Sequence, residues 1–221
     1  MKIGTAFSSY YLRQIGVVTP IGDQSPEQIT EERIPKIDLD DLANQASACT
    51  ACSLSQGRTQ VVFGVGNPEA DIVFIGEAPG RDEDIQGKPF VGRAGKLLDR
   101  MLASLGLDRT SAYIMNVIKC RPPGNRDPKP EEVVACSRWF EPQWQAIDPK
   151  MVVLLGRVAA HEVLSTDAPL ATLRGRWHEV RGVPVRVTYH PAYLLRSPNQ
   201  KRRSWEDFLS VAEKHRGITI K

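Results

Sequence analysis

Residues 71–105 read DIVFIGEAPGRDEDIQGKPFVGRAGKLLDRMLASL, and this stretch decides the fold. Its apolar run at 71–75 predicts a short buried strand, which a turn rich in glycine and proline ends. Residues 94–105 then place leucine and methionine side chains on one face at helical spacing. Ligands in open α/β sheets bind beyond the carboxyl ends of the strands. We therefore expect the irregular, glycine-rich residues 77–90 to line a binding site.

The rest of the chain alternates predicted strands and helices. Strands are predicted at 61–65, 112–117, 151–155, 172–180 and 183–189. Helices are predicted at 41–55, 131–147, 157–164 and 204–215. This alternation favours a mostly parallel sheet with helices on both faces. Parallel strands would end at one edge of the sheet, where we expect Gly76, Glu77, Ala78, Asn116, Gly156 and His190. Such groups suit hydrogen bonding to a small polar ligand.

Length and composition indicate one domain with an N-terminal extension. The chain has 221 residues, of which 41% are hydrophobic, and this is enough for a substantial core. Residues 1–42 show little periodicity and predict an irregular or partly ordered extension, to which the sequence assigns no function. Residues 43–221 predict the folded domain.

The charge is unevenly distributed along the chain. The net charge is +3, but residues 157–203 hold nine arginines and lysines against three acidic residues. A basic second half favours a polyanionic partner, and an ordinary solvated surface is the alternative. No apolar run approaches the roughly 18 residues of a membrane span, and the N-terminus lacks the apolar core of a signal peptide. We expect a cytoplasmic protein, and a monomer.

Four cysteines form two pairs, Cys49-x2-Cys52 and Cys120-x15-Cys136. Cytoplasmic cysteines are usually reduced, so the pattern favours a metal site over disulfides. Four thiolates can hold a zinc ion or a [4Fe–4S] cluster, and the spacing does not decide between them. Four unrelated buried thiols are the remaining alternative. A metal here would be structural, because it would tie the N-terminal helix to the loop and helix after the second buried strand.

Four segments carry a pattern specific enough to indicate a family. They are GEAPGRDED at 76–84, GKPFVGRAGKLL at 87–98, YIMNVIKCRPPGNRDPKPEEVVAC at 113–136 and HPAYLLR at 190–196. With the interleaved cysteines, they resemble the family 4 uracil-DNA glycosylases. The resemblance implies a three-layer αβα fold with a central, mostly parallel four-stranded sheet. It implies hydrolysis of the bond between uracil and deoxyribose in DNA, which leaves an abasic site. It also implies a structural [4Fe–4S] cluster on Cys49, Cys52, Cys120 and Cys136.

The resemblance further implies catalytic and binding roles around a uracil that is flipped out of the helix. Phe90 resembles the ring on which the base stacks. Asn116 resembles the amide that pairs with O4 and N3–H of uracil and rejects cytosine. His190 resembles the donor to uracil O2, which stabilises the charge that builds on the departing base. The backbone N–H groups of Glu77 and Ala78 would join the same anion site. A core phenylalanine, an asparagine cap and a structural histidine are the ordinary alternatives.

The sequence pattern does not identify the residue that activates the attacking water. The best-known members of the superfamily place an aspartate at the position of Ala78, so another residue must orient the attacking water. We expect Glu83 to take this catalytic role, with Asp84 and Glu77 as alternatives. Departure of uracil as an anion would need only weak activation of the water.

The segment HPAYLLR resembles the loop that enters the minor groove of DNA. Leu194 or Leu195 would be the apolar wedge that fills the gap left by the flipped base. Arg196, Lys201 and Arg202 would contact phosphates, which makes binding dependent on salt. The sequence does not decide between single- and double-stranded DNA.

Three other functions stay open at this point. A related glycosylase with a different base preference is one, although the branch that traps DNA covalently carries a histidine that residues 120–132 lack. A non-catalytic iron–sulfur DNA-binding protein of the same fold is the second. A zinc-stabilised binding module is the third.

Overall fold

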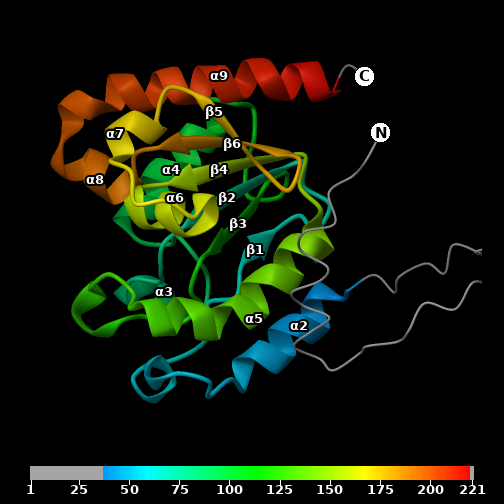
Figure 1. Cartoon of the computed structure of the whole chain (residues 1–221), viewed down its shortest axis with the longest axis vertical. Coiled ribbons are helices and arrows are strands. Elements are labelled where there is room, and N and C mark those ends of the chain that lie inside the picture. Colours follow the sequence, from blue (N-terminus) through cyan, green and yellow to red (C-terminus); the bar gives the residue numbers. More distant parts are fainter. Residues whose placement is uncertain (1–36, 220–221) are drawn as a thin grey trace, which may run out of the picture. The chain divides into compact units, whose positions relative to one another are not determined.

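A six-stranded mixed sheet forms the centre of the fold (Figure 1). The computed structural model describes residues 37–219, so residues 1–36 of the predicted extension lie outside the described residues. The strands are β1 (Val65–Gly66), β2 (Ile72–Gly76), β3 (Tyr113–Asn116), β4 (Met151–Leu155), β5 (Trp177–Val180) and β6 (Val183–Thr188). Their order across the sheet is β1-β3-β2-β4-β6-β5.

The four central strands are parallel, as the sequence predicts. β2 pairs in parallel with β3 and β4, and β4 pairs in parallel with β6. The predicted number of four strands is wrong, because β1 and β5 add antiparallel edges beside β3 and β6. The apolar pattern does predict strands near both edges, at 61–65 and 172–180, whereas the count of four comes from the family resemblance. The observed β1 has only two residues, and β5 is only partly buried.

Helices connect the strands and cover the sheet. The helices are α2 (Leu39–Ser47), α3 (Arg81–Gln86), α4 (Arg93–Ala103), α5 (Pro130–Ile147), α6 (Arg157–Leu164), α7 (Leu170–Leu173), α8 (Pro191–Arg196) and α9 (Lys201–Thr219). Short 3₁₀ turns are η1 (Ser53–Gln56), η2 (Pro123–Asn125) and η3 (Pro198–Gln200). The helices predicted within 94–105, 131–147, 157–164 and 204–215 correspond to α4, α5, α6 and α9.

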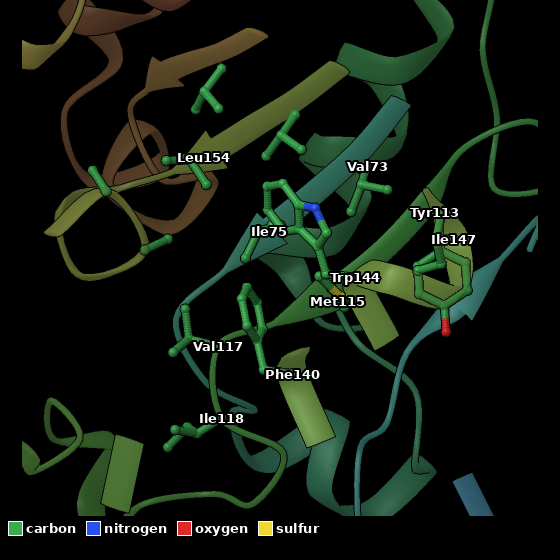
Figure 2. Packing of buried hydrophobic residues seen from close by; sticks show 14 of the residues in the cluster. Val73, Ile75, Tyr113, Met115, Val117, Ile118, Phe140, Trp144, Ile147 and Leu154 are labelled. Atoms are coloured by element: carbon green, nitrogen blue, oxygen red, sulfur yellow. The ribbon is translucent and has the colours of Figure 1, made fainter. Parts of the chain in front are cut away.

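The core has two layers because successive strand residues point to opposite faces of the sheet. On one face, Val73 and Ile75 of β2 share an apolar cluster with Trp144 of α5 (Figure 2). On the other face, the ring of Phe74 stacks on Phe208 of α9, with their centroids 6.1 Å apart. Each fully buried side chain of this size stabilises the fold by about 1.5–3 kcal/mol. Helices therefore cover both faces, and the predicted three-layer arrangement is confirmed.

Local structure differs from the sequence prediction at three places. The helix predicted at 41–55 ends at Ser47, and Cys49 and Cys52 lie between this helix and η1. Ala46 and Leu54 are both buried, so apolar spacing does not reveal the break between helix and turn. The predicted loop at 77–90 contains α3, and the strand predicted at 172–180 begins within the end of α7, so that the observed β5 starts only at Trp177. The predicted domain boundary after residue 42 lies inside α2.

Candidate active site

The parallel strands end together and set up the site. Their last residues are Gly76, Asn116, Leu155 and Thr188, in β2, β3, β4 and β6. Gly76 and Asn116 are direct partners in the sheet register. The turn after β2 is fixed to the next strand, because the Gly76 carbonyl accepts a bond from Val117 N.

Gly76 has no room for a side chain because two functional groups lie over it. A Cβ there would stand 2.5 Å from Asn116 Oδ1 and 2.5 Å from Cζ of Phe90. Asn116 is 1% exposed, and its Oδ1 is buried without a hydrogen-bond partner among the described residues. An unpartnered buried amide oxygen is costly, so this atom calls for a donor from a ligand.

His190 completes this group. Its ring centroid lies 5.5 Å from that of Phe90, with 30° between the ring planes. Gly156 lets His190 approach, because it adopts φ +95° and a Cβ there would stand 2.8 Å from the His190 Cβ. We call Gly76, Phe90, Asn116 and His190 the edge cluster. An aromatic face, an amide and an imidazole thus meet at one edge of the sheet.

The imidazole of His190 is a neutral donor. Burial, followed by the charge of Arg196, lowers the pKa of His190 to about 4. Its Nδ1 accepts a bond of 3.1 Å from Ala192 N at the start of α8. A neutral imidazole carries one proton, so that proton lies on Nε2. The ring is therefore prepared to donate from Nε2.

The backbone of Phe90 is held from two sides. Its φ is +55°, which is unusual for a residue with a side chain. Gly95 permits this turn, because a Cβ there would collide with the Phe90 carbonyl. Arg109 donates to the carbonyls of Pro89 and Phe90, and Glu83 Oε1 accepts from the N–H of Gly92 at 3.0 Å. The ring position is thus fixed by the loop.

The three acidic candidates differ in their contacts. Glu83 also accepts from Val91 N and, through its other oxygen, from Gly80 N. Asp84 is buried and accepts from both the backbone and the hydroxyl of Thr59. These two carboxylates hold the loop. In contrast, burial and then the nearby Asp127 raise the pKa of Glu77 to about 7, with Arg157 opposing them.

The predicted DNA-binding residues divide between surface and interior. The sequence offers Leu194 or Leu195 as the wedge, and Leu194 is buried, with 1% of it exposed. It points inward because α8 packs against α4, a contact that the local sequence does not reveal. Leu195 is 37% exposed, and so is Tyr193, which the sequence analysis did not select.

The predicted phosphate contacts are all at the surface. Arg196 at the end of α8 is exposed, as are Lys201 and Arg202 at the start of α9. Arg202 lies 3.5 Å from Glu206, and an exposed pair of this kind contributes little to stability. We call residues 193–203 the exposed segment.

The four cysteines line one cavity, together with Arg58, Lys119 and Trp139. Arg58 Nη1 lies 3.4 Å from Cys120 Sγ, and Lys119 N donates to Cys136 Sγ at 3.3 Å. Among residues 37–219, no three His, Cys, Asp or Glu side chains converge in a way that would hold a single metal ion. We call these cysteines the four-cysteine site.

Lys119 is a site residue that sequence reasoning missed. It is 1% exposed, and its Nζ donates to the Asn116 carbonyl at 2.8 Å and to Gln143 Oε1. Burial lowers its pKa to about 8, with Cys136 opposing the shift. The feature of the sequence that could have revealed it is a lysine placed directly between the apolar pair Val117-Ile118 and Cys120.

The α/β fold presents a ring, an amide and a neutral imidazole at one sheet edge, an arrangement that is suited to binding a small planar ligand. The family model described as Uracil DNA glycosylase superfamily matches residues 63–209. A type-4 uracil-DNA glycosylase of Archaeoglobus fulgidus is 47% identical over 79% of this chain and 92% of its own length. One of Thermotoga maritima is 43% identical over 73% and 85%. A type-5 uracil-DNA glycosylase of Thermus thermophilus is 34% identical over 47% and 54%.

The chain therefore belongs to the uracil-DNA glycosylase superfamily, and within it to the type-4 uracil-DNA glycosylases. In the described range, 37–219, none of the helices has the length and apolar character needed to cross a bilayer.

Proposed function

We propose that this chain removes uracil from DNA by hydrolysing its N-glycosidic bond, which leaves an abasic site for repair. Its family consists of enzymes that act on this class of bond. The observation that carries the proposal is the buried, unpartnered Oδ1 of Asn116 beside the rings of Phe90 and His190. Each of these groups has a counterpart on a flipped uracil.

Asn116 supplies the discrimination between uracil and cytosine. Its Oδ1 accepts from N3–H of uracil, and its amide nitrogen donates to O4. Cytosine offers an acceptor at position 3 and a donor at position 4, so both groups would be mismatched. Because Asn116 is buried, a mismatch leaves unpaired polar groups that water cannot reach. Phe90 supplies the stacking face and no base preference of its own.

His190 acts on the departing base. Negative charge builds on uracil as the bond to the sugar breaks, and Nε2–H of His190 donates to O2 where that charge develops. The pKa of about 4 keeps the imidazole neutral at physiological pH, so it works as a hydrogen-bond donor. The backbone N–H groups of Glu77 and Ala78 lie in the turn after β2 and join this anion site.

Glu77 is the group that we assign to the attacking water. The sequence favours Glu83, but both oxygens of its carboxylate are occupied by backbone N–H groups of the loop, from Gly80, Val91 and Gly92. Glu77 has a raised pKa of about 7, which suits a carboxylate that accepts a proton near neutral pH. Glu83 then acts indirectly, by holding the loop that carries Phe90.

The exposed segment binds the DNA. Leu195 takes the place of the flipped base in the stack, and Tyr193 lies beside it with a comparable exposure. Arg196, Lys201 and Arg202 contact phosphates, so affinity falls as salt rises. A monomer suffices for this arrangement, and we keep the prediction of a cytoplasmic location.

The residues of the four-cysteine site fit a [4Fe–4S] cluster better than a zinc ion. A zinc ion requires four ligands around one point, whereas each thiolate of a cluster binds a different iron. The four thiols surround a shared cavity and do not converge on one point. Cys49, Cys52, Cys120 and Cys136 would hold the cluster, which would supply a structural link between the segment from α2 to η1, the segment after β3 and helix α5.

An oligonucleotide assay tests the proposed function. An end-labelled strand with one uracil is incubated with purified protein and treated with alkali, which breaks the strand at an abasic site. Matched strands carry cytosine or thymine at the same position, and Asn116→Ala is the control variant. We expect breakage at uracil only, and far less with Asn116→Ala.

Other outcomes of the assay point to other functions. Breakage at a different base would indicate an altered base preference. No breakage by protein with the visible absorbance of an iron–sulfur cluster would overturn the proposal in favour of a non-catalytic DNA-binding protein. Absence of that absorbance, with bound zinc, would identify a zinc-stabilised module.

A further inference from the structure

Lys119 is a buried cation between two sites. Its side chain is 1% exposed, and its ammonium lies 5.6 Å and 5.7 Å from the ring centres of Phe63 and Phe140. Within the described part of the chain, this ammonium has no carboxylate partner. Placing an uncompensated charge in an apolar core is costly, so such a residue needs a function or a nearby anion.

One set of contacts connects Lys119 to the base-reading amide. Its Nζ donates to the backbone carbonyl of Asn116, at the point where β3 ends. The segment that follows is bound back to the turn after β2, since Val117 N and Ile118 N donate to the carbonyls of Gly76 and Glu77. Lys119 therefore fixes the backbone that carries the Asn116 side chain.

The other contacts connect Lys119 to the four-cysteine site. Its N–H donates to Cys136 Sγ, and the residue lines the same cavity as the cysteines. Its Nζ also donates to Gln143, which lies two helical turns beyond Cys136 on α5. Thiolates that bind iron carry negative charge, which would compensate the ammonium in the core.

We propose that Lys119 is a positioning residue through which the four-cysteine site holds the Asn116 amide in place for base reading. The proposal rests on the proposed function. In this proposal, an iron–sulfur cluster held by the four-cysteine site would support base discrimination and would take no part in the reaction itself. Loss of iron or loss of the ammonium should then loosen the same piece of backbone.

Hydrogen exchange with and without an iron chelator tests this coupling directly. The proteins are the full-length wild type, Lys119→Met, which keeps the length of the stem, and the matched control Lys150→Met, at an exposed lysine that pairs with Asp71 on the surface. In the wild type, chelation should speed exchange at Val117 and Ile118 about 10-fold or more. In Lys119→Met these amides should exchange fast from the start, with little further change on chelation. Lys150→Met should behave as the wild type.

The same proteins are compared for selectivity, a property that a merely structural lysine would not change. The ratio of single-turnover rates on uracil and cytosine should fall by about 10- to 100-fold in Lys119→Met. Binding to uracil-free DNA should stay unchanged. The amide of Gly156, which bonds to Thr188 in another part of the sheet, is the internal exchange control.

Specific outcomes of the exchange and selectivity experiments would overturn the proposal. Equal chelator effects in the wild type and Lys119→Met would show that the link bypasses Lys119, and an unchanged selectivity ratio would exclude positioning of Asn116. If Lys119→Met does not fold, Gln143→Met takes its place, because this variant removes the acceptor of Lys119 on α5. A response like that of the wild type in Gln143→Met would count against the proposal. A wild type without glycosylase activity would refute the proposed function, whereas the exchange result would still decide the coupling.

Discussion

The edge cluster and the exposed segment differ in how far their side chains are buried and fixed. In the edge cluster, Asn116 and Phe90 are almost fully buried and fixed by backbone bonds from several elements. In the exposed segment, Arg196 and Lys201 extend into solvent. Discrimination between two similar bases requires fixed groups away from water, because only there is a mismatched pair costly. Attraction to phosphates requires accessible charges and little fixed geometry.

This contrast predicts that removing a hydrogen-bond donor from the edge cluster causes the largest loss of excision rate. His190→Ala should lower the single-turnover rate on uracil by about 10²–10³-fold, because no donor then faces the charge on the departing base. Binding to uracil-free DNA should be nearly unchanged. The measurement is quenched-flow excision beside a filter-binding titration. A rate close to wild type would remove His190 from the mechanism.

A single methyl group should also disable the edge cluster. Gly76→Ala places a Cβ 2.5 Å from Asn116 Oδ1 and from the Phe90 ring, so both must move. A displacement of this size should cost about 100-fold in rate. Gly217→Ala is the matched control, since a Cβ there meets nothing within 4 Å. Normal excision by Gly76→Ala would mean that the observed packing is not needed for catalysis.

The pH dependence of the rate tests which acid beside the edge cluster activates the attacking water. Glu77 must be ionised to accept a proton, and its pKa is raised to about 7, so activity should rise with pH. Between pH 6 and pH 8 the rate should increase about tenfold and then level off. Glu77→Gln should be slower and lose this dependence, whereas Glu83→Gln should keep it. A flat profile for the wild type would argue against Glu77.

Two neighbouring leucines of the exposed segment, of which one is buried and one is exposed, should give the smallest effect on DNA binding and the clearest contrast between stability and binding. Leu195→Ala should weaken DNA binding a few-fold and leave the midpoint of thermal unfolding unchanged, because the side chain is exposed. Leu194→Ala should instead lower the free energy of unfolding by about 2–5 kcal/mol, because it opens a cavity in the core. Denaturant unfolding and DNA titration of both variants provide the measurement. Identical behaviour of the two variants would contradict the division into buried and exposed positions.

The sequence predicted the members of the edge cluster but not how they are held. Phe90, Asn116 and His190 follow from strand ends and from the family resemblance. The function of Glu83 as a clamp on the backbone depends on Gly80 and Gly92, which meet its carboxylate only after α3 has formed. Hydrogen bonds between residues separated along the chain leave no periodic trace, so the sequence pattern did not reveal that Glu83 holds the loop.

The sequence by itself determined the parallel sheet, the two helical layers and the set of residues at the carboxyl edge. These features follow from the spacing of hydrophobic residues and from motifs of adjacent residues, and both are local properties of the sequence. Only the tertiary structure decided the antiparallel pairing of β1 with β3, the burial of Leu194 and the position of Lys119 between Asn116 and the four-cysteine site. Those depend on which surfaces meet across the core. Such contacts are set by the packing of distant segments, and neighbouring residues in the chain do not encode them.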